Sequence, residues 1–448
     1  MQLMIDEIRE AAIRPIVKPG KWWGWVTGLL GLILLGGLGA YVYQLKNGLG
    51  VTALDDGVFY GIYMTNLVTF IGISYGGAIV SAILRLTNAA WRAPITRLAE
   101  GMAVVSLIIG AAFAIVDMGR LPSLWWILVT PNPFSPVVWD IVAITTYVFA
   151  SILFFILPVI PDSAILLNSS GNRFSAWRRK IYSLISLKWA GLSGQQKTLG
   201  RAMAIMSVVI IPLAVSVHSV LAWVFAVTSR EGWHSSIFGP YFVVGALFSG
   251  VAAVTLVVAF FRKAYGLEKY IGQKQFRYLG FLMLTLGAIY LYFTFAEFLT
   301  EGYVQYLETV PFLRSILVAD YAPLFWPFVI AGVIIPIVIV AFPKTRNARG
   351  ITLAAGLVVL GMWLKRFLII VPPLRVGMFG TTYPPYSGSW VEWVITLAAA
   401  AAVPFFLLLL FRIFPVLPIY EMQEIAEEQS SDQARKSLEL THQAEQGI

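Results

Sequence analysis

Three ionisable residues interrupt stretches of sequence that are otherwise apolar. Asp117 stands in AIVDMGR, Asp140 in VVWDIVA and His218 in SVHSVLAW. Ionisable side chains at membrane depth are costly and therefore mark functional sites by default. Two carboxylates and an imidazole around one cavity can accept protons and form hydrogen bonds to a polar ring. These residues predict a proton-accepting site, provided that the helices that carry them are neighbours.

Each of the three residues also has a purely structural interpretation, which the sequence leaves open. Asp117 could pair with Arg120 at the end of a helix. Asp140 could complement the dipole of a first helical turn. His218 could be a packed core histidine. The functional interpretation rests on the clustering of all three toward one end of consecutive predicted spans.

The whole chain is apolar enough to lie in a bilayer. Of its 448 residues 58% are hydrophobic and 12% are charged, whereas soluble domains are about half apolar and about one quarter charged. About 20 apolar residues span a bilayer, and lipid forbids unpaired backbone groups. The sequence predicts an all-α integral membrane protein with ten transmembrane helices, at 22–45, 58–84, 98–119, 137–160, 199–229, 238–261, 276–300, 321–342, 351–371 and 390–411.

Basic residues gather in the loops that follow the second, fourth, sixth and eighth spans. The positive-inside rule places these loops and both termini in the cytoplasm of a prokaryotic cell, with the chain in its cytoplasmic membrane. The net charge of +9 then reflects topology, and no nucleic acid is expected as a partner. The run AWRRK at 176–180 could bind an acidic partner, but an interfacial anchor is the preferred interpretation.

The loops on the opposite, outer side are rich in aromatic residues and proline. Examples are LPSLWWILVTPNPFSP, VPPLRVGMFGTTYPPYSG and SREGWHSSIFGP, which holds Trp233 and His234. Aromatic residues favour membrane interfaces, and proline stiffens loops. These loops therefore suit a docking face or the roof of a pocket, although His234 could be an ordinary interfacial residue. The polar tail from Glu421, which includes His442, is expected to be solvated and is assigned no chemistry.

A second polar group lies elsewhere in the spans. Tyr75 and Glu100 lie toward the cytoplasmic side, and Glu297 lies toward the outer end of its span. Lys365 and Arg366 interrupt the ninth span, and an intramembrane pair of Glu297 with Arg366 is predicted, as a structural ion pair or as part of a proton path. Glu392 begins the tenth span as a helix-start acid. The glycines of GISYGGAIVSA and VVGALFSGVAAV allow close helix packing.

Residue usage limits the cofactors that the chain itself can hold. It has no cysteine and only three histidines, so thiolate-bound iron–sulfur clusters are excluded and a metal site is not expected. Redox chemistry would then need a diffusible cofactor or a partner subunit. Two other functions stay open: a secondary transporter with an intramembrane ion or substrate site, and a b-type cytochrome with His218 and His234 as axial ligands.

Several segments resemble the NrfD-like (polysulfide reductase membrane subunit) family in family order. They are ITRLAEGMAV, IVDMGRLP, SPVVWDIVAITTYVF with LPVIPD, SVHSVLAWVFAVTSREGWHSSIFGPYFVVGALFSG, LKRFLIIVPP and YPPYSGSWVEW. The resemblance is greatest to the long, ten-span members, such as the large membrane subunit of alternative complex III. It covers about residues 58 to 420.

The resemblance implies a haem-free, quinone-binding subunit of a respiratory complex. Menaquinone or ubiquinone would exchange electrons with a peripheral iron–sulfur subunit on the outer face, with proton translocation in some members. Further membrane subunits, a multihaem cytochrome or a molybdenum subunit are implied partners. Two four-helix bundles, spans two to five and six to nine, would be flanked by spans one and ten. The chain would then divide into six parts. They are a cytoplasmic amphipathic N-terminus (1–21), the first flanking span (22–45), the quinone-binding four-helix bundle (58–230), the second four-helix bundle (238–373), the last flanking span (390–412) and the cytoplasmic tail (413–448).

Site residues follow from the matched motifs. Asp117 falls at the quinone-facing position before Gly-Arg, Asp140 matches the acid after tryptophan, and His218 matches the histidine of S-V-H. The chain departs from the alternative complex III type at Val224, where that type has an acid, and at Tyr75, where it has a histidine. The expected quinone-binding set is Asp117, Arg120, Asp140, His218, Trp233 and His234, and the expected proton path is Tyr75, Glu100, Glu297, Lys365 and Arg366.

Overall fold

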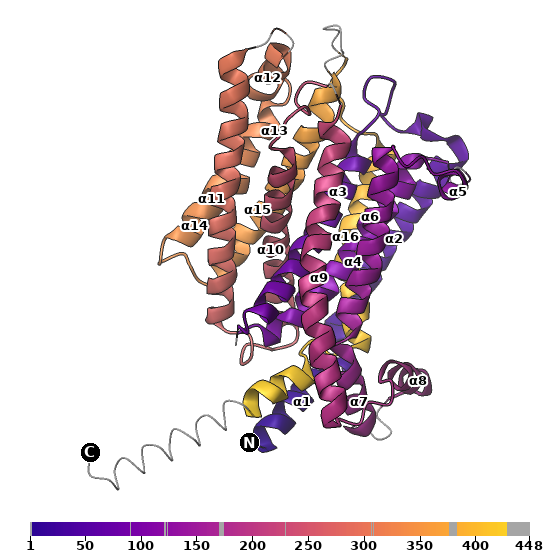
Figure 1. Ribbon diagram of the computed structural model, residues 1–448, viewed down its shortest axis with the longest axis vertical. Helices are drawn as coiled ribbons and strands as arrows, with labels where there is room; N and C mark the ends of the chain where they lie inside the picture. The colour runs from indigo at the N-terminus through magenta and orange to yellow at the C-terminus, as the bar shows by residue number, and fades with distance from the viewer. Residues whose placement is uncertain are drawn as a thin grey trace.

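The chain folds into long helices that run side by side (Figure 1). The structure, a computed structural model, describes residues 2–89, 91–120, 122, 124–169, 174–228, 230–305, 307, 309–375 and 383–427. His442 and most of the predicted tail lie outside these residues. The helices are α1 (Gln2–Val17), α2 (Lys21–Asn47), η1 (Leu49–Val51), α3 (Ile62–Leu86), α4 (Ala93–Met118), α5 (Leu124–Val129), α6 (Pro136–Ile156), α7 (Val159–Ser169), α8 (Ala176–Ile185), α9 (Ser193–Ala226), α10 (Phe238–Ala264), α11 (Gln273–Val304), α12 (Thr309–Leu317), α13 (Ala322–Pro327), η3 (Phe328–Ile334), α14 (Ile335–Ala341), α15 (Ala348–Arg375) and α16 (Trp390–Ile413).

The predicted spans are confirmed within the described residues, where ten helical runs are long and apolar enough to cross a membrane. The end bounds differ by a few residues, and two runs contain an irregularity that was not predicted. The fourth extends to Asn168, with a break between α6 and α7 at Pro158, because proline lacks the N–H of a helical hydrogen bond. The eighth contains the π-helical turn η3 between Pro327 and Pro336.

Helices from distant parts of the sequence lie side by side. α2 packs along α16, which brings the first and last spans together. In the first half of the chain, α4 and α9 each contact both α3 and α6. In the second half, α11 and α15 each contact both α10 and α14. These contacts are the ones that two four-helix bundles would make. The grouping into bundles, and the domain boundaries drawn from it, stay predictions.

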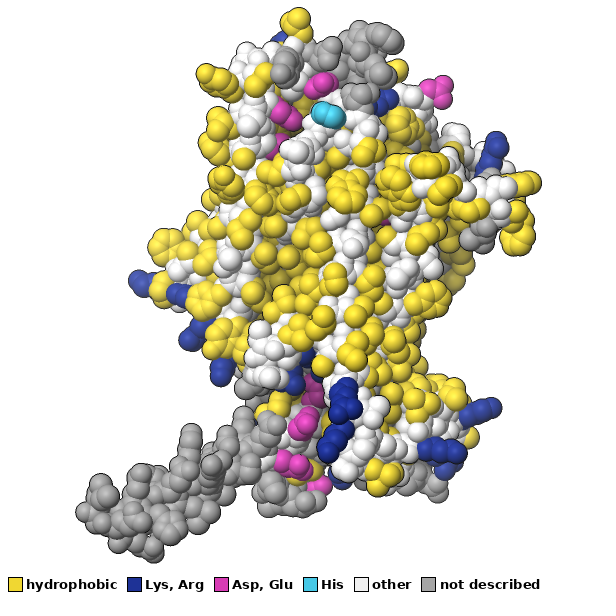
Figure 2. All heavy atoms as spheres, viewed as in Figure 1, with side chains coloured by type: hydrophobic (Ala, Val, Ile, Leu, Met, Phe, Trp, Pro, Cys, Tyr) yellow, Lys and Arg dark blue, Asp and Glu magenta, His cyan; other side chains and the backbone are white. Residues whose placement is uncertain are grey.

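The surface has the polarity of a protein embedded in lipid. Figure 2 shows apolar side chains over the middle of the visible face, while most of its lysine and arginine side chains lie toward the end that holds α1 and α8. We call this the α8 end, and we call the opposite end, where α5 and α12 lie, the α5 end. The charge asymmetry is the physical basis for the predicted orientation.

The predicted close packing of helices through glycine is confirmed where α3 crosses α10. A Cβ atom on Gly76 would lie 2.3 Å from the Cα of Gly250, so neither position has room for a side chain. Small residues at such crossings allow the dispersion contacts that hold helices together in lipid. This crossing joins the two predicted bundles.

Replacing Gly76 by alanine should therefore lower the melting temperature of the purified protein. The added methyl group pushes α3 from α10, and overpacking of this kind costs about 1–3 kcal/mol. The matched control is Gly28→Ala in α2, where a Cβ would have nothing within 4 Å. Equal melting temperatures for the two variants would contradict the tight crossing.

Candidate functional site

Asp117 and Asp140 lie near Tyr60 at the α5 end. Asp117 is the next-to-last residue of α4, and Asp140 lies in the first turns of α6. The pKa of the Tyr60 hydroxyl is raised by burial, and the nearby charges of Asp117 and Asp140 raise it further. Tyr60 therefore stays protonated and can donate a hydrogen bond, whereas both acids can accept. Sequence reasoning did not single out Tyr60.

Both acids keep a buried oxygen that has no partner. The Oδ1 atoms of Asp117 and Asp140 are shielded from solvent and make no hydrogen bond within the described residues. Arg120 is exposed, and among the described residues no ion pair joins it to Asp117. Buried polar atoms are normally hydrogen-bonded, so unpaired ones call for an explanation such as a bound molecule.

Exposed aromatic side chains lie between these two acids along the chain. Trp125 and Trp126 of α5 and Phe134 in the following loop are all exposed. Tyr60 lies 6.2 Å, between ring centroids, from Phe225 near the end of α9. The stretch of chain that links the two acids thus exposes aromatic side chains, which suit contact with an apolar ring or a partner protein.

His218 lies deeper in the membrane region, on the same face of α9 as Phe225. Seven residues separate the two, or about 10 Å along the helix. His218 is only 1% exposed, and its ring lies 4.7 Å from that of Tyr75, between centroids. Neither ring nitrogen has a hydrogen-bond partner among the described residues, and the Tyr75 hydroxyl has none either.

A small cavity connects His218 with Arg366. It measures about 20 Å³ and is lined by these two residues and by Tyr241, Tyr290 and other residues of α3, α10 and α15, which is room for about one water molecule. Arg366 donates from Nη2 to Ser249 Oγ at 2.7 Å, while its Nη1 has no partner among the described residues. A polar chain can therefore cross from α9 to α15 at this point.

Glu297 pairs with Lys365, so the predicted pair with Arg366 is wrong. The Lys365 Nζ lies 3.2 Å from Glu297 Oε2, and both side chains are buried. Consecutive residues of a helix point about 100° apart, so Lys365 faces α11 while Arg366 faces α10. The ammonium of Lys365 also lies 5.1 Å from the ring centroid of Tyr241.

The two loop residues predicted at the site have different environments. Trp233 is buried, donates from Nε1 to the Ile369 carbonyl at 2.6 Å, and packs on Phe225 with centroids 5.0 Å apart. It holds the loop against α15. His234 is exposed, so its side chain is accessible to a partner.

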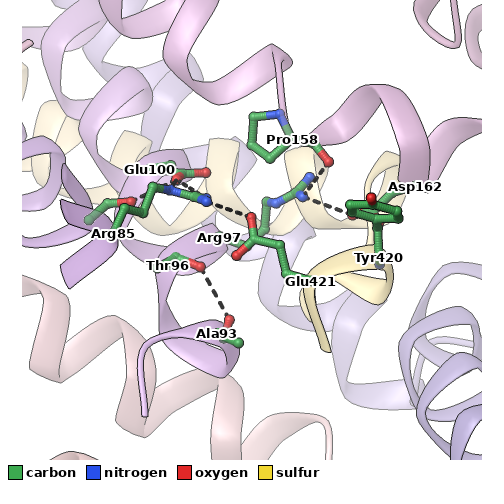
Figure 3. A network of polar contacts seen from close by, with 10 residues as sticks. Arg85, Ala93, Thr96, Arg97, Glu100, Pro158, Asp162, Tyr420 and Glu421 are labelled. Carbon is green, nitrogen blue, oxygen red and sulfur yellow. Dashed lines mark hydrogen bonds and ion pairs between the residues drawn. The ribbon is translucent and has the colours of Figure 1, made fainter. Parts of the chain in front are cut away.

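Glu100 belongs to a buried charge network at the α8 end (Figure 3). Its Oε1 accepts from Ser81 Oγ at 2.7 Å and from Arg85 Nη2 at 2.8 Å. Arg85 also pairs with Glu421 at 2.7 Å. Beside them Arg97 donates to Asp162 at 2.8 Å, and Asp162 accepts from the backbone N–H of Tyr420. Sequence reasoning missed the second pair.

The prediction that the tail from Glu421 is solvated is wrong for its first residues. Val416, Leu417 and Ile419 are buried and dock the segment 416–427 against the helices. This docking places Glu421 beside Arg85. Burial by itself would raise the pKa of the Glu421 carboxyl, but the charges of Arg85 and Arg97 outweigh it, so the pKa lies below its ordinary value.

Removing the Glu421 charge should therefore destabilise the protein at neutral pH. Because the folded-state pKa is lowered, the charge stabilises the fold above pH 4.5 and the effect is lost as the pH falls through the folded value. Glu421→Gln should lower the free energy of unfolding by about 1–3 kcal/mol at pH 7 and flatten its pH dependence below 4.5. The control is the exposed Glu427→Gln on the same segment. Identical pH profiles for the two variants would contradict the role of Glu421.

Within the described part of the chain, no group of three or more histidine, aspartate or glutamate side chains could hold a metal ion. Glu392 caps α16 as predicted: Ser389 Oγ accepts from its N–H, and its own carboxylate accepts from the N–H of Ser389 and of Ala53.

Known relatives match this chain over most of its length. The "Hdr-like menaquinol oxidoreductase integral membrane subunit" of Archaeoglobus fulgidus is 26% identical over 87% of this chain and 93% of its own length. A selenate reductase subunit of Mesobacillus selenatarsenatis is 26% identical over 81% of this chain and 85% of its own length. The family described as "Polysulphide reductase, NrfD" matches residues 50–376, which extend from η1 through α15. The chain belongs to the NrfD family.

Proposed function

We propose that this protein is the quinone-binding membrane subunit of a respiratory oxidoreductase complex. The observation that carries the proposal is the pair of buried carboxylate oxygens of Asp117 and Asp140, unpartnered among the described residues, whose charges reach Tyr60. Support comes from the NrfD family and from relatives whose names describe a menaquinol oxidoreductase subunit and a selenate reductase subunit. The likeness to alternative complex III stays a prediction.

The chemistry follows from the donors and acceptors at this site. Oxidation of a quinol to a quinone releases two electrons and two protons. Asp117 and Asp140 would accept the protons from the two hydroxyl groups, and Tyr60 would donate a hydrogen bond to a quinone carbonyl. Arg120 would lie at the entrance, and His218 would accept or relay a proton from deeper in the helices. The reverse reaction uses the same groups.

The electrons would leave to a partner at the α5 end. The chain has no cysteine for an iron–sulfur cluster of its own, so we propose a peripheral iron–sulfur subunit there, with a multihaem cytochrome or molybdenum subunit and further membrane subunits beyond it. The exposed His234 and aromatic loops suit this docking face. The α5 end would face outward, and the α8 end and both termini would lie in the cytoplasm of a prokaryote.

The second polar group supports a proton path as a further part of the proposal. A row of neighbouring groups crosses the helices: Tyr75, His218, the small cavity and Arg366. The Glu297–Lys365 pair lies on the next face of α15. Glu100 would lie at the other end of such a path. Measuring proton pumping in Glu100 variants distinguishes a network with Arg85 that moves protons from one that only stabilises the fold.

Mild-detergent purification of the native complex tests the proposal. We expect an iron–sulfur protein and an extractable quinone to accompany the chain. His234→Glu at the α5 end should lower recovery of the partner, whereas the matched control Lys344→Glu at the α8 end should not. A lone, quinone-free protein would favour a secondary transporter.

A further inference from the structure

A groove at the α8 end lies outside the proposed quinone site. It measures about 630 Å³ and runs between the α6–α7 junction, the segment 186–194 and the first turns of α9. Its walls are mainly apolar and include Leu157, Ile160, Trp189, Leu192, Leu199 and Ala202. Such a volume and lining suit a hydrocarbon chain.

Hydrogen bonds fix the segment that forms one wall of the groove. Gln195 Oε1 accepts from the N–H of Ala190 at 2.8 Å, and Gln195 Nε2 donates to the Lys188 carbonyl at 3.3 Å. Tyr182 of α8 donates to the Ile413 carbonyl at 2.6 Å, which fixes α8 against the end of α16. The backbone of this wall is thus held in place by side-chain hydrogen bonds.

Two exposed basic residues border the groove. Lys188 stands between two lining residues, and Arg201 stands next to Ala202 on α9; both side chains are exposed. The sequence holds no acidic residue from position 163 to position 230, so the segment that forms this side of the groove carries only positive charge. A positive rim above an apolar groove is complementary to a molecule with an anionic head and an apolar tail.

The neighbouring helix α8 places the groove at the membrane surface. Trp177 and Leu184 are exposed on its apolar stripe, while Arg179 and Lys180 are exposed on its basic face. Helices with this pattern lie in the plane of the interface, with the basic face toward lipid headgroups. In Figure 1, α8 lies to the side of the main helix stack at this end.

We propose that this groove binds an anionic phospholipid, with an acyl chain between α7 and α9 and the phosphate held by Lys188 and Arg201. α8 covers the adjacent interface. The bound lipid joins the α6–α7 helical run to the start of α9, two helices that carry Asp140 and His218 farther along.

Lipid titration of the delipidated full-length protein, followed by native mass spectrometry, tests this site. The probes are phosphatidylglycerol and phosphatidylcholine. We expect the wild type to bind phosphatidylglycerol more tightly. Each basic residue near a membrane surface contributes a factor of about five in affinity, so Lys188→Gln/Arg201→Gln should weaken phosphatidylglycerol binding roughly 25-fold and leave phosphatidylcholine binding unchanged.

Two further variants separate the rim from the groove. Lys344→Gln/Arg277→Gln removes the same charge from other exposed positions at the α8 end and should keep the preference for phosphatidylglycerol. Ala202→Phe fills the groove and should weaken the binding of both lipids. The proposal is overturned if the control pair loses the preference as fully as the rim pair does, or if Ala202→Phe binds both lipids like the wild type.

Discussion

Asp117→Asn should lower the rate of quinol oxidation by about 100-fold or more, because a positioned general base contributes about 10²–10⁴-fold to such proton transfers. The asparagine keeps the shape of the side chain but cannot take a proton. The fold should survive, since the Oδ1 of Asp117 has no partner to lose among the described residues. The measurement is quinol turnover by the purified complex, with quinone binding measured separately.

The pattern of kinetic changes distinguishes a proton acceptor from a structural residue. In Asp117→Asn, kcat should fall while quinol affinity changes little, and Asp117→Glu should recover part of kcat with a shifted pH profile. His218→Ala should also lower kcat. The matched control is Asp56→Asn, an exposed acid in the loop before α3, which should retain wild-type turnover. Normal turnover in both Asp117→Asn and His218→Ala would refute the assignment of the site.

The sequence was sufficient where one physical requirement dominates. Each span must be long and apolar enough to cross lipid, and ten such runs were predicted and are present within the described residues. A helix crossing in lipid requires small residues, and the glycine motifs of α3 and α10 do meet at Gly76 and Gly250. The end-cap role of Glu392 follows from its position three residues after Ser389.

The sequence was insufficient where the choice depends on the rotation of a helix or on a distant partner. Lys365 and Arg366 are equally basic neighbours, and only the rotation of α15 decides that Lys365 meets Glu297. Tyr60 is one of 19 tyrosines, and only the fold places it beside Asp117 and Asp140. Glu421 belongs to a polar segment, and its burial depends on the docking of the apolar residues before it.

Asp162→Asn should strongly destabilise the folded protein. Arg97 and Asp162 are both at most 1% exposed, and the substitution leaves the Arg97 guanidinium buried without the carboxylate that pairs with it. Removing one partner of a buried ion pair costs about 3–5 kcal/mol. The measurement is the free energy of unfolding of the purified protein in mixed micelles, compared with the exposed-pair control Asp6→Asn, which breaks the 3.6 Å pair with Arg9 and should cost less than about 1 kcal/mol.

A double variant shows whether the unpaired charge is the cause. Arg97→Met/Asp162→Asn removes the buried cation as well, while the asparagine oxygen can still accept from the Tyr420 N–H. Replacing both charges of a buried pair by groups of similar shape is often close to neutral, so the double variant should be more stable than Asp162→Asn alone. A double variant as unstable as the sum of the two single ones would mean that Arg97 acts through its other partners, the Pro158 carbonyl and the charge of Glu421, and not through its pair with Asp162.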